Sequence, residues 1–489
     1  MVDYQKQVER WCVQEVWMEG PSDKNPFMDY EVSGEFTSKN QKASVRGFYD
    51  GNGKYCVRFM PSFEEEYTFC ISSNFSSEKQ TGSFTVVPPT KGNHGPVRVC
   101  KTFHFAYEDG TPYYSIGTTC YAWTHQPQQL QEQTLATLKE NVFNKIRFCI
   151  FPKHYDYNKN EPITDPFEKK ADGSWDFSRL NPEHFRLIEK RIGDLRDLGI
   201  EADLILFHPY DRWGFSKMAP ETDDLYLRYV VARYSAYRNV WWSLANEYDL
   251  MDEKTTEDWE RFASILCKED PVGHLRSIHN CRPFYDHSRP WVTHCSIQRT
   301  DNFKTAEYTD EWRSRWNKPI VIDEMVYEGN INHGWGNISG EELTRRFWEA
   351  AMRGGYPGHG ETYMDPNEIL WWSKGGTLHG SSPERFRFLY QILCETPGHG
   401  LTPGSTSLVS PKAEPADRKY KGKYFIFYYG FCRPSFQRYH IDDETEFRVE
   451  ILDTWNMTIT DCGIHKGDFR VDLPGREYIA VRLKAVDLE

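Results

Sequence analysis

The sequence predicts an α/β protein, namely a (β/α)8 TIM barrel flanked by an N-terminal β-sandwich and a small C-terminal β domain. Short alternating runs separated by turn residues occupy both ends of the 489-residue chain. Strand, loop and helix alternate through its middle, and about eight such units match a closed parallel barrel. No Gly-rich phosphate fingerprint follows a predicted strand, which argues against a dinucleotide-binding sheet.

Residues 1–90 are expected to form the N-terminal sandwich. Runs such as 30–36 and 67–71 alternate polar and apolar positions, and the turn sequence 50–53 separates two of them. The Pro- and Gly-containing stretch 88–96 indicates a linker. Residues 404–489 return to short strands and are expected to form the C-terminal β domain.

Residues 91–403 are expected to form the barrel. Helix signals include Asn181-Pro182 as an N-cap and first-turn pair and Gly199 as a stop. We predict strands over 113–119, 145–151, 202–207, 240–244, 275–279, 292–297, 320–322 and 358–363, and helices over 130–142, 182–199, 225–237, 256–268, 341–352 and 383–394.

Two glutamates follow apolar strands and are the candidate catalytic residues. Glu247 comes directly after the fourth predicted strand, and Glu324 comes after the seventh. The carboxyl ends of barrel strands converge on one face, so these side chains are expected to be neighbours. Paired carboxyl groups flanking one bond are what glycoside hydrolysis requires. A separation of about 5 Å is expected for a retaining mechanism and roughly 8 Å for an inverting one.

Other polar and aromatic side chains at strand ends are candidate sugar ligands. Asn246 precedes the first glutamate, and Arg147 could hold a carboxylate ionised if it points inward, although a surface position is equally compatible with the sequence. Aromatic rings suit stacking on sugar faces, and aromatic residues make up 15% of the chain. The remaining candidates are Trp123, His125, His208, Asp211, Asn280, His294, Gln298, Tyr327, Trp335, Glu361 and Trp371.

Ala245-Asn246-Glu247 and Ile322-Asp323-Glu324 resemble the acid/base and nucleophile motifs of the retaining glycoside hydrolases of clan A. More closely, the sequences of 277–280, 292–298, 327–329, 347–348 and 358–363 resemble a bacterial family of glycosidases. In that family an N-terminal domain of unknown-function family 5060 precedes a barrel of family 4038 and a C-terminal domain of family 5605. Some members related through the barrel release terminal pentoses such as apiose, so the resemblance implies a reaction type rather than one substrate.

The expected function is a retaining glycosidase that acts on the ends of small glycosides or oligosaccharides. Glu247 would be the acid/base and Glu324 the nucleophile. A transglycosylase with the same glutamates is an alternative, and so is a non-catalytic carbohydrate-binding protein in which the flanking sandwiches bind sugar. No cofactor or metal is expected, because we find no ligand cluster in the sequence that demands one.

Composition restricts the partners. The formal net charge of -13 makes nucleic acid and anionic membrane surfaces improbable partners, and no apolar run is long enough to span a bilayer. The 12 cysteines lack paired metal-type spacing, and several lie in apolar strand or helix patterns. We therefore expect a cytoplasmic protein with reduced thiols and a small carbohydrate substrate, and a homo-oligomer is compatible with the sequence.

Overall fold

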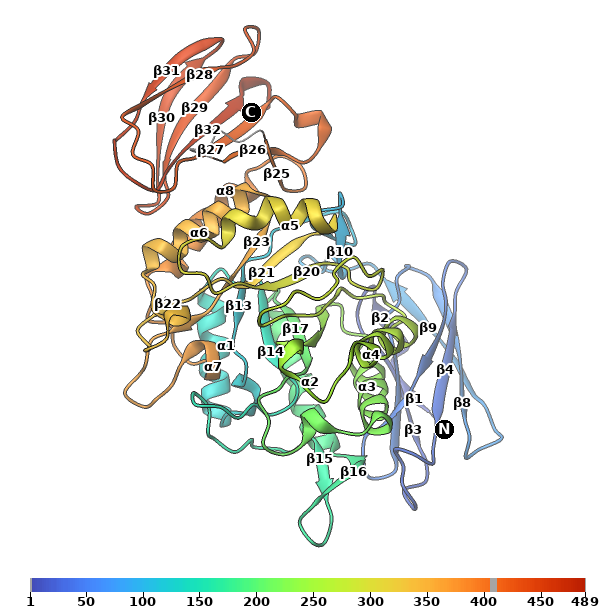
Figure 1. Ribbon diagram of the computed structural model, residues 1–489. Coiled ribbons are helices and arrows are strands. Elements are labelled where there is room, and N and C mark those ends of the chain that lie inside the picture. Colours follow the sequence, from blue (N-terminus) through green and yellow to red (C-terminus); the bar gives the residue numbers. More distant parts are fainter. Residues whose placement is uncertain (1, 405–410, 489) are drawn as a thin grey trace.

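The computed structural model describes residues 2–404 and 411–488, which form a central barrel with a β-sheet body at each end (Figure 1). The N-terminal body packs two sheets face to face. Val32–Thr37 alternates buried and exposed positions along its length, as expected for a strand with one face in the core. One sheet has the order β1 (Asp3–Tyr4), β3 (Gln14–Glu19), β7 (Lys54–Phe59), β6 (Phe48–Tyr49), and the other has the order β2 (Gln7–Glu9), β9 (Gln80–Val87), β8 (Glu66–Ser73), β4 (Val32–Thr37), β5 (Lys42–Arg46).

The central sheet is an eight-stranded parallel barrel, which confirms the predicted fold class. A parallel bridge between His279 and Ser296 joins its first and last strands. Because these strands are buried on both faces, they are continuous apolar runs instead of alternating ones. In spatial order they are β19 (Arg276–Ser277), β18 (Val240–Ala245), β17 (Glu201–Phe207), β14 (Lys145–Cys149), β13 (Gly117–Thr119), β23 (Tyr356–His359), β21 (Ile320–Glu324) and β20 (Cys295–Gln298).

Helices surround the barrel (Figure 1), and three of them begin with a side-chain N-cap. Asn181 accepts a hydrogen bond from the Glu183 amide, Ser339 accepts one from the Glu342 amide, and Thr255 forms a reciprocal capping box with Asp258. Helix α5 was not predicted, because eight residues with few apolar positions give little periodic signal. The helices are α1 (Gln128–Glu140), α2 (Pro182–Asp197), α3 (Pro220–Tyr234), α4 (Thr256–Glu269), α5 (Thr309–Trp316), α6 (Gly340–Met352), α7 (Trp371–Lys374) and α8 (Ser382–Cys394).

A three-stranded antiparallel sheet closes the N-terminal end of the barrel. It consists of β10 (Val97–Cys100), β11 (His104–Tyr107) and β12 (Pro112–Tyr113). The Phe105 ring lies 5.3 Å from Trp241 and 4.9 Å from Tyr356, both near the starts of barrel strands. The single strand predicted over 113–119 is therefore two elements, because Tyr113 belongs to this floor and the first barrel strand begins at Gly117.

The C-terminal body is built around a six-stranded sheet, and β25 already belongs to this sheet before residue 404. The order of the strands in this sheet is β25 (Leu401–Pro403), β26 (Lys412–Pro415), β27 (Tyr424–Tyr428), β32 (Ile479–Ala485), β29 (Phe447–Asp453), β30 (Thr458–His465). Strand β28 (Phe436–His440) pairs separately with β31 (Asp468–Asp472). No helix in the described residues is long and apolar enough to cross a membrane. Two further strand pairs lie in barrel loops, β15 (Phe167–Lys169) with β16 (Trp175–Leu180) and β22 (Glu328–Gly329) with β24 (Glu361–Thr362).

Candidate active site

A cavity of about 400 Å³ opens where the barrel strands end at their carboxyl termini. Glu247 and Glu324 both line it, although 77 residues separate them in sequence. Each is almost fully buried, with 6% and 7% of its surface exposed. The other lining residues are Tyr121, Lys153, Tyr155, Asp156, Tyr157, Tyr210, Asn246, Cys281, Arg282, Gln298, Thr300, Trp335 and Trp372.

Glu247 is held in position by its backbone and by two side chains. Its φ of 52° is left-handed, a conformation that costs a non-glycine residue about 1 kcal/mol or more and that functional sites often retain. The Tyr210 hydroxyl donates a hydrogen bond to Glu247 Oε2, and Asn246 Nδ2 lies 3.3 Å from the same oxygen. The carboxyl group is therefore directed into the cavity by contacts from two strand ends.

Glu324 is surrounded by donors. The Tyr121 hydroxyl donates a hydrogen bond to Glu324 Oε1, and Arg147 Nη1 lies 3.9 Å from that oxygen. Arg147 Nη1 also donates to Asn246 Oδ1 at 2.8 Å, so the guanidinium touches the environments of both glutamates. Val326, two residues after Glu324, has a φ of 73°, which is strained for a β-branched residue.

Burial alters the ionisation of Glu324. Burial, and next the charge of Glu247, raise the pKa of Glu324 to about 7, against the opposing effect of Arg147. The Glu324 carboxyl group therefore exchanges its proton near neutral pH.

A layer of paired charges supports the site from below. Lys145 Nζ lies 2.9 Å from Asp203 Oδ2 and 2.8 Å from Asp323 Oδ1, all inside the barrel. Lys145, Arg147 and other neighbouring groups hold the pKa of Asp323 below its usual range despite burial. Asp323 therefore stays ionised directly beside Glu324, while its charge is compensated by Lys145.

Aromatic side chains form the cavity walls. The Trp335 and Trp372 rings are 4.9 Å apart, and Tyr157 packs edge-on against both, at 5.9 and 5.7 Å. Trp372 Nε1 and Gln298 Oε1 are buried polar atoms without a hydrogen-bond partner among the described residues. Apolar rings combined with a few unpaired donors and acceptors form a surface suited to a sugar.

Some of the predicted sugar ligands lie in or beside this cavity. Asn246, Gln298 and Trp335 line it. Asn280 supports Gln298, since its side chain bonds both the amide and the carbonyl of that residue. Tyr327 is buried behind the wall, with its ring 6.4 Å from Trp335 and 6.2 Å from Trp372.

Four predicted ligands instead stabilise the barrel framework. Trp123 is fully buried against Phe148. His125 donates a hydrogen bond from Nε2 to the Ile150 carbonyl, and His208 donates one from Nε2 to the Phe151 carbonyl. Burial lowers the pKa of His125 to about 3 and that of His208 to about 4, so both are neutral framework groups. Asp211 accepts hydrogen bonds from the Trp213, Gly214 and Ser216 amides and organises its own loop.

Three more predicted ligands lie away from the cavity lining. His294 packs against Phe105 and Trp241 at the opposite, N-terminal end of the barrel. The Glu361 carboxylate accepts hydrogen bonds from the backbone amides of His379 and Gly380. Trp371 donates to Thr118 within the barrel wall, and its neighbour Trp372 faces the cavity instead.

Tyr121 and Lys153 were not among the predicted site residues. Each follows a barrel strand and lines the cavity. The signal that could have identified them is the same one that identified the glutamates, a polar side chain soon after a buried strand. In single tyrosines and lysines this signal is weak, because both residue types also occur on ordinary loops.

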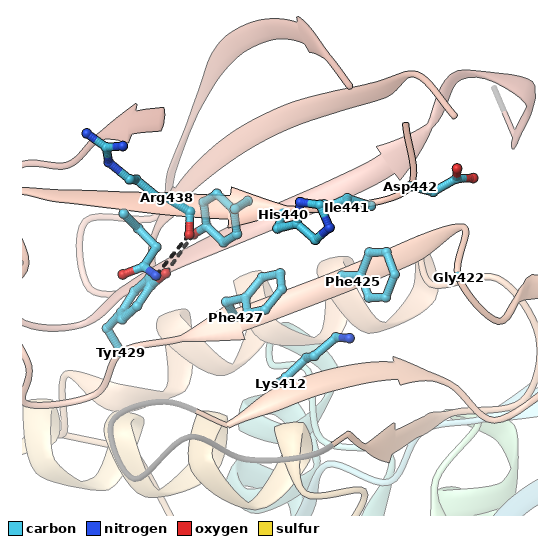
Figure 2. Close-up of a pocket in the computed structure, with 11 residues that line it drawn as sticks. Lys412, Gly422, Phe425, Phe427, Tyr429, Arg438, His440, Ile441 and Asp442 are labelled. Carbon is cyan, nitrogen blue, oxygen red and sulfur yellow. Dashed lines mark hydrogen bonds between the residues drawn. The ribbon is translucent and has the colours of Figure 1, made fainter. Parts of the chain in front are cut away.

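A second cavity of about 430 Å³ lies in the C-terminal body. Figure 2 shows Phe425 and Phe427 projecting from one strand beneath the strand that carries Arg438 and His440. Among the described residues that line it, Asp442 is the single acidic one, and it is exposed. This cavity therefore lacks the buried carboxyl pair of the barrel.

Comparison with protein families resolves the identity of the barrel. An apiosidase-like catalytic domain model matches residues 101–383, which is more than half of the chain. The chain belongs to this family of apiosidase-like glycosidases. Domains of unknown function 5060 and 5605 match residues 7–74 and 413–484, as the resemblance implied, whereas family 4038 is not among the matches.

Solved structures agree with this assignment. A candidate glycoside hydrolase from Bacteroides vulgatus ATCC 8482 is 37% identical, with a TM-score of 0.91 over 99% of this chain and 100% of that one. A glycoside hydrolase family 5 protein from the same organism is 14% identical, with a TM-score of 0.62 over 81% and 94% of the two chains, and supports the fold alone. No curated protein matches the chain. The apiosidase-like glycosidase thus has a TIM-barrel catalytic domain between two β bodies.

Proposed function

We propose that this protein is a retaining glycoside hydrolase of clan A type that removes terminal sugars by double displacement. The observation that carries the proposal is the pairing of two buried glutamates in one cavity, at the ends of the fourth and seventh barrel strands. A hydrogen-bonded path runs between them through Arg147. Tyr121 donates to Glu324 and accepts from Arg147 Nη1, which also donates to Asn246, and Asn246 Nδ2 donates to Glu247.

In the first step a Glu324 oxygen attacks the anomeric carbon, and the glycosidic oxygen leaves with the proton of Glu247. The products are a glycosyl ester on Glu324 and a free alcohol. In the second step the Glu247 carboxylate accepts a proton from water, whose oxygen attacks the anomeric carbon and releases Glu324. Both steps conserve charge, and neither consumes another reactant.

The mechanism requires Glu324 to be ionised and Glu247 to carry a proton when the attack begins. Arg147 and Tyr121 favour the ionised form of Glu324, because they place positive charge and a donor near Glu324 Oε1. The pKa of about 7 for Glu324 opposes this form in the free protein. A substrate bound between the two groups would therefore have to favour the ionised form of Glu324.

Action on chain ends is supported by the size and walls of the cavity. Its volume of about 400 Å³ is near the lower end of the range for small-molecule sites, about 300–1,000 Å³. Trp335, Trp372 and Tyr157 form a continuous aromatic wall on one side.

The proposal includes a small carbohydrate substrate and a cytoplasmic location. A homo-oligomeric state stays a prediction.

A panel of nitrophenyl glycosides, including furanosides, tests the proposal. Turnover of at least one member is the expected result, with a large loss in both Glu247→Ala and Glu324→Ala. Turnover that survives both substitutions would place catalysis elsewhere. Addition of an acceptor alcohol separates hydrolysis from transglycosylation, since a transglycosylase yields the alkyl glycoside and little free sugar.

A further inference from the structure

Lys153 is a buried cation at the active-site cavity, and no described residue forms an ion pair with it. Its side chain follows strand β14 and is 2% exposed. Among the described residues, none places a hydrogen-bond acceptor or a carboxylate within bonding distance of Nζ. Burying an unpaired ammonium costs several kcal/mol, so a group that stays unpaired calls for a functional explanation.

An aromatic cage holds this ammonium without using its donors. Nζ lies 3.4 Å from the ring centre of Tyr121, 4.2 Å from Tyr210, 4.7 Å from Tyr155 and 5.7 Å from Trp372. Such cation–π contacts offset part of the desolvation cost. The three N–H groups, however, still need oxygen acceptors. All four rings and Lys153 line the catalytic cavity, so a bound ligand can supply those oxygens.

The cage also places Lys153 beside the reacting bond. Tyr121 donates to Glu324, and Tyr210 donates to Glu247. Since Nζ lies over both of these rings, the ammonium is near the groups that bond both glutamates, and a sugar bound between the glutamates can reach it.

Lys153 forms no direct ion pair with either glutamate. No Glu247 or Glu324 oxygen lies within 4.0 Å of Nζ, whereas Arg147 approaches Glu324 to 3.9 Å. Burial lowers the pKa of Lys153, and the surrounding carboxylates counter this effect in part. The exposed Asp156 is the remaining acidic group of the lining, and water screens its charge.

We propose that Lys153 binds a carboxylate on the cleaved sugar and that the natural substrates are glycosides of uronic acids. A hydroxyl group would satisfy the ammonium donors but leave its charge unpaired. A carboxylate does both, with two oxygens that accept charge-assisted hydrogen bonds. This inference rests on the proposed glycosidase function for the orientation of the sugar, and it adds the class of substrate.

Calorimetric titration with free uronic acids and their neutral counterparts tests the proposal. D-glucuronate, D-galacturonate, D-mannuronate and L-iduronate are compared with glucose, galactose, mannose and idose. At least one acid is expected to bind about tenfold or more tightly than its neutral partner, and Lys153→Met should abolish that preference. A wild-type protein that shows no preference for any acid overturns the proposal.

Two variants separate recognition from folding. Lys153→Met removes an unpaired buried charge and should leave the melting temperature equal or higher, whereas a purely structural lysine would lower it. Lys159→Met is the matched control, because Lys159 is on the same loop with its side chain 69% exposed, and its uronate preference should equal that of the wild type. A destabilised Lys153→Met that keeps its uronate preference contradicts the proposal.

The nitrophenyl panel distinguishes failure of this inference from failure of the proposed function. Cleavage of neutral glycosides with no cleavage of uronides would retain the glycosidase and reject uronic acid recognition. Lys153-dependent uronate binding without turnover of any glycoside would retain the recognition site and reject catalysis.

Discussion

The barrel cavity and the C-terminal cavity are similar in volume, about 400 and 430 Å³, and both have aromatic walls. They differ in where their charges lie. Glu247 and Glu324 are buried and face the same space. In the C-terminal cavity His440 is 78% exposed and pairs with Asp468 at the rim, and Lys412 pairs with Glu414.

This difference explains why only one of the two cavities is equipped for acid–base chemistry. Hydrogen bonds from Thr445 and the Glu444 amide keep the pKa of the exposed Asp442 below its usual range, whereas burial raises the pKa of Glu324 to about 7. Volume and aromatic lining alone therefore do not identify an active site. The position of charged groups relative to water does.

The largest expected effect comes from removing Glu324. Glu324→Ala removes the nucleophile, so turnover should fall by about ten-thousandfold or more. Azide or formate can enter the vacated space and attack the anomeric carbon from the same side. Product analysis should then show a glycosyl azide of inverted configuration, and retention of near-normal turnover would contradict the assignment.

Removal of Glu247 should depend on the leaving group. Glu247→Ala loses the proton donor, so activity on poor leaving groups should fall by about a hundredfold to ten-thousandfold. Dinitrophenolate needs little protonation, and its first-step rate should survive. Steady-state and pre-steady-state rates with dinitrophenyl and methyl glycosides measure this contrast. Equal losses on both substrates, with leaving-group dependence in Glu324→Ala instead, would exchange the two roles.

The titration of Glu324 should appear in the stability of the protein. A carboxyl group whose pKa is raised in the folded state costs no stability below the ordinary value of 4.5, costs more as pH rises towards about 7, and reaches a constant cost above it. Glu324→Gln should therefore be favoured over the wild type by up to about 3 kcal/mol more at about pH 8 than at about pH 4. Denaturant unfolding at the two pH values measures this difference, and a pH-independent difference would contradict the raised pKa of Glu324.

The smallest effect is expected in the C-terminal cavity. Asp442→Ala and His440→Ala alter exposed groups in a cavity separate from the buried glutamates, so kcat/KM should change by less than about twofold. The same assays used for the barrel variants measure it. A loss approaching that of Glu247→Ala would remove the distinction between the two cavities.

The fold and the placement of the two glutamates in one cavity could be predicted because their signals are local. Buried parallel strands are continuous apolar runs, and a carboxylate that follows one stands out, as in Trp241 and Trp242 before Glu247. The floor of the barrel was missed, because nothing in the sequence near Tyr113 shows that a hairpin packs into the barrel end.

The lining of the cavity was less predictable than its carboxyl groups. His208 and Tyr210 lie two residues apart, yet one bonds a framework carbonyl and the other bonds Glu247. Trp371 and Trp372 are adjacent and point to the barrel wall and to the cavity, respectively. Sequence spacing places such residues near the strand ends, but side-chain direction depends on packing between elements distant in sequence.

The anomeric configuration of the first-formed product tests the central claim most directly. Proton NMR during hydrolysis of the best nitrophenyl glycoside records it before mutarotation. Double displacement through Glu324 predicts that the released sugar has the same anomeric configuration as the substrate. An inverted first product would mean that Glu324 activates water instead of bonding to the sugar, and would contradict the account.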